Sequence, residues 1–187
     1  MATSPNVILV DVFDNEIGTA AKLQAHVTPM LHRAFSVFLY NDDKMLIQQR
    51  AQGKYHSAGK WANSCCSHPR PGESLTDAVT ARMKEEIGFS CDVEELFDFV
   101  YFAHLGEDLY EYEYDHVFIG EYVGEYTLNP QEAQAAEWIS MDELQKQLIE
   151  NPEKFSVWFL SAAPRVITEI RRRKWRKHVA KNKGQTE

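Results

Sequence analysis

The sequence predicts a single α/β (α+β) domain in which a mixed β-sheet lies between helices. One segment, residues 75–87, carries apolar side chains at helical spacing, and β-rich runs lie before and after it. We call this segment the central helix. Helices placed among strands in this way favour a sheet covered by helices. A chain of 187 residues is long enough for one sizeable core. We therefore expect one domain over residues 1–187, with further N-terminal strands and C-terminal helices.

The strands are predicted from β-branched and aromatic residues that lie between turn signals. In chain order they are residues 6–13, 34–40, 45–49, 95–103, 111–122 and 136–140. A turn at residues 14–15 ends the first strand, and the Asn/Asp run at residues 41–43 predicts a hairpin between the second and third. The strand over residues 111–122 alternates most strongly.

The central helix has clearly marked ends. Ser74 and Asp77 are spaced as a capping pair at its start, and Gly88 is placed to terminate it. Arg82 and Glu86 lie four residues apart on one edge of the helix, so both side chains can face one pocket.

Two more helices are predicted after the last strand. The first covers residues 141–149 and stops before Pro152. The second covers residues 155–176 and is interrupted near Pro164, because proline disrupts a helix interior. Residues 165–187 form a basic tail with nine Lys or Arg and two Glu. We interpret this tail as a solvated helix end, where cations suit the helix dipole.

The rest of the chain is acidic, with 11 basic and 26 acidic residues. An acidic body argues against nucleic acid as the main ligand. The three cysteines make no disulfide framework, which favours a reducing compartment. No secretory signal is evident, and no apolar stretch approaches the roughly 20 residues that cross a bilayer. We expect a monomeric cytoplasmic protein that is not inserted in a membrane and acts on a small molecule.

Reactive side chains are concentrated in residues 61–69, just before the central helix. Cys66 and His68 lie there among polar neighbours. A buried, inert role is the commonest one for an intracellular cysteine, but polar neighbours are unusual in a core. Cys65 and Cys66 point to opposite sides of an extended segment, so only one of them faces a given pocket. The sequence assigns no role to Cys65 or His56.

Glu111 and Glu113 lie two residues apart on a predicted strand, so both carboxylates face the same side. Alone, this pattern is typical of a solvated strand face. His26, His32 and His68 offer imidazole partners, and imidazoles with carboxylates suit Zn²⁺, Mn²⁺ or Fe²⁺ better than Mg²⁺. The histidine spacings match no familiar zinc motif, so a metal site and a solvated face both stay open.

The end of the central helix carries a second possible metal site. Glu85 and Glu86 are either surface charges or ligands of a Mg²⁺–diphosphate complex, because Mg²⁺ takes one or two carboxylates and several phosphate oxygens. The spacing resembles the Nudix box, Gly–x5–Glu–x7–Arg–Glu–U–x–Glu–Glu–x–Gly–U, where U is apolar. The positions that match are Glu73, Glu85, Glu86, Gly88 and Phe89, while Ser67, Ala81 and Arg82 replace the first Gly, the Arg and the next Glu.

These departures resemble the modified Nudix box of type 1 isopentenyl-diphosphate isomerases, which have a Nudix fold. The resemblance covers residues 7–158 and is most specific at residues 31–39, residues 63–69 and the Glu111–Tyr–Glu113 motif. It implies the reversible conversion of isopentenyl diphosphate into dimethylallyl diphosphate. In that reaction a proton is added to one end of an alkene and another is removed from the allylic carbon.

The resemblance also implies a role for individual residues. Cys66 and Glu113 match the acid–base pair, and Tyr101 matches the tyrosine that assists the glutamate. The matching metal ligands are His26, His32, His68, Glu111 and Glu113 for Zn²⁺, Mn²⁺ or a similar ion, and Glu86 for Mg²⁺ on the diphosphate. The matching substrate contacts are a cationic clamp of Lys22, Arg50, Lys54 and Arg82, and the aromatic Trp158. We hypothesise that Glu113, with Tyr101, protonates the terminal carbon and that Cys66 removes the allylic proton.

Two other functions stay open on the sequence alone. A Nudix pyrophosphohydrolase acting on a nucleoside diphosphate derivative shares the fold and Mg²⁺, but it needs the Arg and Glu that Ala81 and Arg82 replace. A catalytically inactive Nudix domain that binds a partner through the basic tail leaves Cys66, Glu113 and Trp158 without a shared purpose.

Overall fold

The fold was obtained as a computed structural model that describes residues 6–106 and 108–183, with side chains described as far as Ala180. Within these residues the strands are β1 (Asn6–Val10), β2 (Glu16–Ala21), β3 (His32–Asn41), β4 (Lys44–Arg50), β5 (Trp61–Ala62), β6 (Cys65–Ser67), β7 (Glu94–Gly106), β8 (Leu109–Glu121) and β9 (Ala133–Ser140). The helices are α1 (Lys22–Val27), α2 (Leu75–Ile87), α3 (Met141–Glu150) and α4 (Val157–Lys183), with a short 3₁₀ turn, η1 (Pro152–Lys154). The last residues of the predicted tail, 184–187, lie outside the described part.

The sheet is organised around β3, the strand with the most neighbours. β3 pairs antiparallel with β1, β4 and β6, and parallel with β8. β2, β9 and β7 extend the sheet from β1, β4 and β8. The parallel pairing makes the sheet mixed, as predicted, and it sets His32 beside Glu113.

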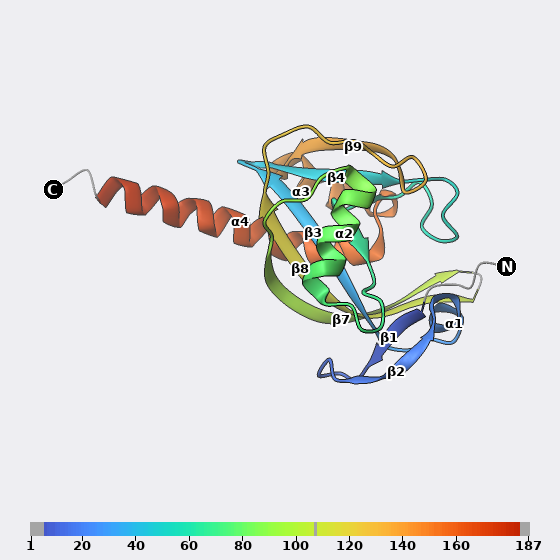
Figure 1. The fold of residues 1–187 in the computed structure, drawn as a ribbon. Helices are drawn as coiled ribbons and strands as arrows, with labels where there is room; N and C mark the ends of the chain where they lie inside the picture. The colour runs from blue at the N-terminus through green and yellow to red at the C-terminus, as the bar shows by residue number, and fades with distance from the viewer. Residues whose placement is uncertain (1–5, 107, 184–187) are drawn as a thin grey trace.

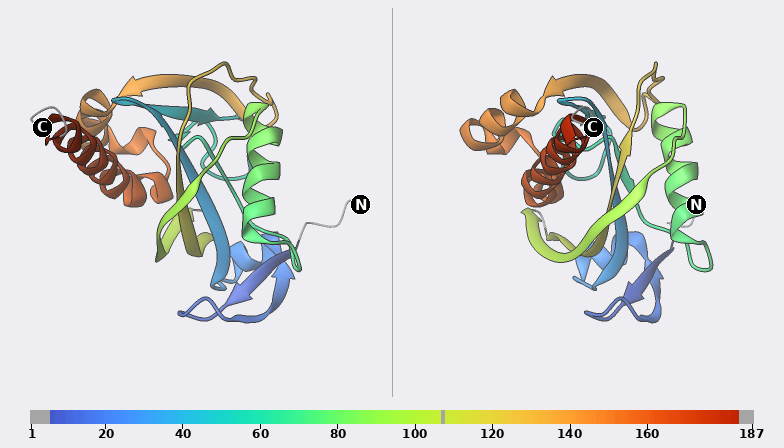
Figure 2. Two further views of the ribbon diagram at one scale, coloured as in Figure 1. Left: turned by 60° about the vertical axis from the view of Figure 1, so that its left-hand side comes forward. Right: turned by 90° about the vertical axis from the view of Figure 1, so that its left-hand side faces the viewer.

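Helices cover both faces of this sheet (Figure 2), which confirms the predicted architecture. On one face, α2 buries Val79, Met83 and Ile87 against strand residues that include Phe35. On the other, the first half of α4 packs Phe159 against the rest of the core. Figure 1 shows the second half of α4 projecting beyond the body, and β1, β2 and α1 lying together at the end of β3 that is far from this projection.

The central helix, α2, has the predicted bounds and caps. The Asp77 backbone N–H donates to Ser74 Oγ over 3.1 Å, and Gly88 ends the helix in the left-handed conformation with a φ of 81°. A β-carbon at Gly88 would lie 3.0 Å from Thr127, so space as well as backbone conformation favours glycine there.

Two predictions for the ends of the chain are wrong. Pro164 does not interrupt α4, because side chains on both sides of it, such as Ala163 and Val166, are buried in the same core. That packing outweighs the loss of one helical hydrogen bond. The first strand ends at Val10 rather than residue 13, because Asp11 Oδ1 accepts two turn N–H groups. The short elements α1, β5 and β6 were not predicted, and β2 was expected only as a further N-terminal strand without bounds.

Candidate active site

A cavity of about 200 Å³ lies where β3, β6 and β8 meet α2, α4 and the loop over residues 51–60. Nine of the residues predicted for the site line it: Lys22, Arg50, Lys54, Cys66, His68, Arg82, Glu111, Glu113 and Trp158. The remaining four, His26, His32, Glu86 and Tyr101, are buried behind this lining. The fold therefore brings together side chains from strands, helices and a loop that lie far apart in the sequence.

Two buried histidines are held with one ring nitrogen free. His26 Nδ1 lies 2.7 Å from the Lys22 carbonyl oxygen, and His32 Nδ1 lies 2.8 Å from the Met30 carbonyl oxygen. Because a carbonyl oxygen only accepts hydrogen bonds, each Nδ1 must carry the ring proton. In the neutral ring Nε2 therefore has a free lone pair. Burial lowers the pKa of His26 to about 4 and so favours that neutral ring. Neither Nε2 atom has a hydrogen-bond partner.

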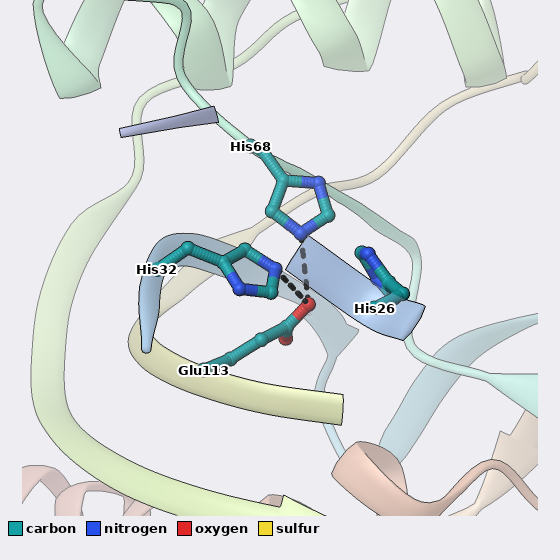
Figure 3. A group of neighbouring side chains, drawn as sticks. All are labelled: His26, His32, His68 and Glu113. Atoms are coloured by element: carbon teal, nitrogen blue, oxygen red, sulfur yellow. Dashed lines mark hydrogen bonds and ion pairs between the residues drawn. The ribbon is translucent and has the colours of Figure 1, made fainter. Parts of the chain in front are cut away.

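The Nε2 atoms of His26 and His32 face the side chains of His68 and Glu113 (Figure 3). Candidate ligand atoms of His26, His32, His68 and Glu113 all lie within 4.8 Å of one another. Glu113 Oε1 is 2.8 Å from His68 Nε2 and 3.6 Å from His32 Nε2. Glu111 adds an oxygen, Oε2, that lies 3.3 Å from His26 Nε2 and has no hydrogen-bond partner. Unpaired, buried nitrogen and carboxylate donors that converge in this way fit a divalent metal ion.

The two glutamates do not form a solvated strand face. Glu111 and Glu113 are only 2% and 7% exposed, so that alternative is wrong. The face of β8 that carries them is covered by α1, which contributes His26, by the loop that contributes His56, and by His68 after β6. Asp115, the next residue on the same side of β8, is also buried and accepts a hydrogen bond from Ser36 over 2.9 Å.

The two carboxylate oxygens of Glu113 have different partners. Oε1 faces the histidines, whereas Oε2 accepts a 2.5 Å hydrogen bond from Tyr101 Oη. Tyr101 lies directly opposite Glu113 in the β7–β8 pairing. Burial, reinforced by the charge of Glu113, raises the pKa of Tyr101 well above its ordinary value, so the phenol stays a donor.

Cys66 and Trp158 form an apolar part of the cavity wall. Burial, with a further contribution from Glu86, raises the pKa of the Cys66 thiol to about 12, so the thiol is neutral in the free site. The indole N–H of Trp158 donates to Asn63 Oδ1 over 3.1 Å. Asn63 Nδ2 donates to the Cys65 carbonyl oxygen over 2.6 Å, so one amide fixes both the indole and the thiol strand. Asn63 was not predicted, although it lies in the polar segment that carries Cys66.

The opposite end of the cavity is charged. Arg82 contacts Glu85, Glu86 and Glu132, and Lys54 also contacts Glu132. Glu86 accepts a second hydrogen bond from Gln48 Nε2 over 2.6 Å, so its carboxylate lies behind Arg82 rather than in the lining. Three carboxylates, those of Glu85, Glu86 and Glu132, thus share the two cations Arg82 and Lys54, and this excess of negative charge fits a divalent cation at the predicted Mg²⁺ ligand Glu86. Glu132, in the loop before β9, carried no recognisable sequence signal.

Comparison with known proteins identifies the family of this chain. Residues 30–159 match the NUDIX domain. The chain is 45% identical over 163 residues to isopentenyl-diphosphate Delta-isomerase 2 of Aromatoleum aromaticum, and the aligned region covers 87% of this chain and 86% of that protein. It is 46% identical over 156 residues to isopentenyl-diphosphate Delta-isomerase of Serratia proteamaculans, covering 83% and 87%. The chain belongs to the isopentenyl-diphosphate Delta-isomerase family of Nudix proteins. The predicted family and fold are thus confirmed.

Solved structures support the fold of this isomerase-family chain. It superposes on DR0079 from Deinococcus radiodurans with a TM-score of 0.70 at 15% identity, covering 86% of this chain and 98% of that one. A NUDIX-family hydrolase from Clostridium perfringens gives a TM-score of 0.54 at 15% identity, covering 73% and 96%. At such low identity these likenesses show the Nudix fold alone. Within the described residues, no helix has the length and apolar character needed to cross a membrane.

Proposed function

We propose that this chain interconverts isopentenyl diphosphate and dimethylallyl diphosphate for isoprenoid biosynthesis. The observation that carries the proposal is the joint placement of Cys66 and Glu113 in one cavity whose other end carries the charged side chains of Lys54, Arg82 and Glu132. The substrate has the same polarity, with a short hydrocarbon at one end and a diphosphate at the other. We further propose that the enzyme works as a cytoplasmic monomer, in keeping with three free cysteines.

The cationic clamp binds the diphosphate and sets the position of the hydrocarbon. Lys22, Arg50, Lys54 and Arg82 all line the cavity. In the free site Arg82 is occupied by carboxylates, including Glu86. Glu86 would hold Mg²⁺ on the diphosphate, and the ion would supply positive charge next to the phosphate oxygens. Arg82 would then bind phosphate oxygens in place of the carboxylate.

The reaction needs two proton transfers at different carbons. A proton joins the terminal CH₂ carbon, which leaves a tertiary cation at the neighbouring carbon. The allylic C–H bond then gives up its proton, and its electron pair becomes the new double bond. An ordinary thiol or carboxylic acid, with pKa values of about 8.5 and 4.3, is too weak to protonate an isolated alkene in water. The site must therefore position both groups and exclude water.

Trp158 stabilises the cation but does not account for the rate. An indole face contributes about 2 kcal/mol to a desolvated cation, which corresponds to roughly 30-fold in rate. Most of the remaining acceleration must come from placing an acid and a base at the two reacting carbons.

We assign the first proton to Glu113 and the second to Cys66. Oε2 of Glu113 is the oxygen next to Tyr101 Oη, so these two atoms form the donor pair while Oε1 keeps the carboxylate in place. Cys66 must lose its own proton before it accepts the allylic one, and its raised pKa opposes this order. The opposite order, with the thiol as first donor, is therefore the competing assignment. Cys66→Ser that still exchanged allylic protons at the wild-type rate would contradict ours.

Proton NMR in D₂O tests the activity. Isopentenyl diphosphate and Mg²⁺ should give dimethylallyl diphosphate that carries deuterium in a methyl group. Cys66→Ala should give none, whereas Cys65→Ala, which removes the adjacent thiol from the opposite face, should behave as wild type. Unchanged substrate with the wild-type protein and metals supplied would reject the proposal. Phosphate release from nucleotides would favour the hydrolase alternative instead.

We also propose that His26, His32, His68, Glu111 and Glu113 hold one Zn²⁺, Mn²⁺ or similar ion, which holds Glu113 in place when bound. Chelation should remove one ion per chain and abolish activity, and refilling should restore it. At an ion concentration of 100 times Kd, the ion should raise the free energy of unfolding by about 2.7 kcal/mol. Equal stability with and without the ion would contradict this assignment.

A further inference from the structure

His56 lines the cavity but takes no part in the reaction proposed above. It lies in the loop over residues 51–60, which joins β4 to β5. Its side chain is only 8% exposed, and its Nδ1 lies 3.5 Å from Glu111 Oε1. Its ring centroid is 5.6 Å from that of His26. The histidine therefore stands between the metal-binding residues and the substrate cavity.

The loop fixes this inward position through its backbone and its neighbours. Ser57, the next residue, has a φ of 50°, a left-handed conformation that reverses the chain directly after His56. The His56 carbonyl oxygen accepts a 3.4 Å hydrogen bond from Arg50. The imidazole ring meets Tyr55 edge-on at 4.4 Å and Trp158 at 6.1 Å between centroids. The ring thus contacts both the substrate wall and the metal-binding residues.

Two of the three sets of candidate ligand atoms in the described residues share a member, and the third, Glu95, Asp98 and His116, lies apart from them. His26, His56 and Glu111 make one set within 4.8 Å, and His26, His32, His68 and Glu113 make the other. Because His26 Nδ1 is held by the Lys22 carbonyl oxygen, His26 has only Nε2 to offer. One lone pair binds one ion, so the two sets describe a single centre and not a pair of metals. The buried Glu111 Oε2 and His26 Nε2 lack hydrogen-bond partners, as expected for donors in such a centre.

We propose that His56 is a sixth donor of this centre and closes the coordination position that faces the substrate. The inference rests on the metal centre proposed above. Ions such as Mn²⁺ favour six donors, so the other five residues, with one ligand atom from each, leave one position for water. A metal-bound water is a strong nucleophile, and beside a tertiary cation it would trap the intermediate as an alcohol. His56 excludes that water.

Water-proton relaxation of the Mn²⁺-loaded protein tests the inference without any measurement of activity. Mn²⁺ alone is the probe, and the relaxation rate reports how many water molecules exchange on the ion. The wild-type protein should show none, and His56→Ala should show one. The Kd for Mn²⁺ should also rise about tenfold or more in the variant. Added imidazole should occupy the opened position and reduce the relaxation rate again.

His104→Ala is the matched control, because His104 stacks on Tyr110 and belongs to neither ligand set. It should leave both the water count and the Kd unchanged. If His56→Ala does not fold, His56→Asn gives the same test, since the shorter amide should also open the position to water. Wild-type protein that binds no Mn²⁺ would reject the metal centre itself. Mn²⁺ binding with one water in the wild type, or none in either His56 variant, would reject only the role of His56.

Discussion

Cys65 and Cys66 are neighbours on β6, yet they belong to opposite faces of the sheet. Cys65 is fully buried in the core beneath α2, together with apolar residues such as Met83. Cys66 lines the cavity with His68 and Glu113. One face of the strand therefore contributes apolar packing, and the other contributes chemistry. The comparison teaches that stability and activity should respond separately to changes on the two faces.

The cavity face contains groups that are unfavourable in a core. His26, Glu111 and Asp115 are buried there with incomplete hydrogen bonding, and each such group costs about 1–3 kcal/mol. The apolar clusters around α2 and α4 offset this cost. A rigid core on both sides is what allows the reactive groups to be held in fixed positions.

The largest effect is expected for Glu113→Gln on the cavity face. The amide keeps the shape of the side chain but cannot exchange a proton as a carboxyl group does. The rate should fall about 10³-fold or more, while the free energy of unfolding should change by about 1 kcal/mol at most when no metal is bound. Initial rates by NMR and urea denaturation of the metal-free protein measure the two quantities. A rate within tenfold of wild type would remove Glu113 from the acid–base pair.

Tyr101→Phe should have a smaller effect on the same face. It removes the 2.5 Å hydrogen bond to Glu113 Oε2 but keeps the aromatic ring in the core. We expect kcat to fall about 10²-fold with KM unchanged, because Tyr101 does not line the cavity. A rise in KM without a change in kcat would show that the phenol serves substrate binding instead.

Lys54→Gln should affect binding more than chemistry. Lys54 lies at the diphosphate end of the cavity and contacts Glu132. KM should rise about tenfold, kcat should change by less than about threefold, and the difference should shrink at high salt. Lys84→Gln, on an exposed part of α2, is the control and should change neither constant. Equal losses in both constants would place Lys54 in the chemical step.

The sequence was sufficient to predict the central helix, the family and most of the cavity lining. The reason is that Ser74, Gly88 and the residues around Cys66 act through local chemistry or a recognisable motif. The prediction that Glu111 and Glu113 point to the same side was also correct, because side chains alternate along any strand. Their burial was undecided, since it depends on α1 and the loop over residues 51–60 packing against that face of β8.

The parts that could not be predicted depend on contacts between distant segments. Glu132 meets Arg82 and Lys54 only after the loop before β9 folds back over α2. His56 faces Glu111 because its loop turns at Ser57, which has a left-handed backbone conformation. Serine rarely adopts this conformation, so the sequence does not indicate the turn. The continuity of α4 through Pro164 likewise reflects packing of the whole helix, which outweighs a strong local signal.

Cys65→Ala should give the smallest effect and the sharpest comparison with Cys66→Ala. Removing a buried sulfur from the face beneath α2 should lower the free energy of unfolding by about 1 kcal/mol and leave the isomerisation rate within about twofold. Met83→Ala sets the scale for that face, with an expected loss of about 2–5 kcal/mol. A Cys65→Ala protein with unchanged stability but a lower isomerisation rate would contradict the separation of stability and activity between the two faces. Because the Asn63 amide binds the Cys65 carbonyl oxygen and not its side chain, the substitution should leave the position of the neighbouring thiol unchanged.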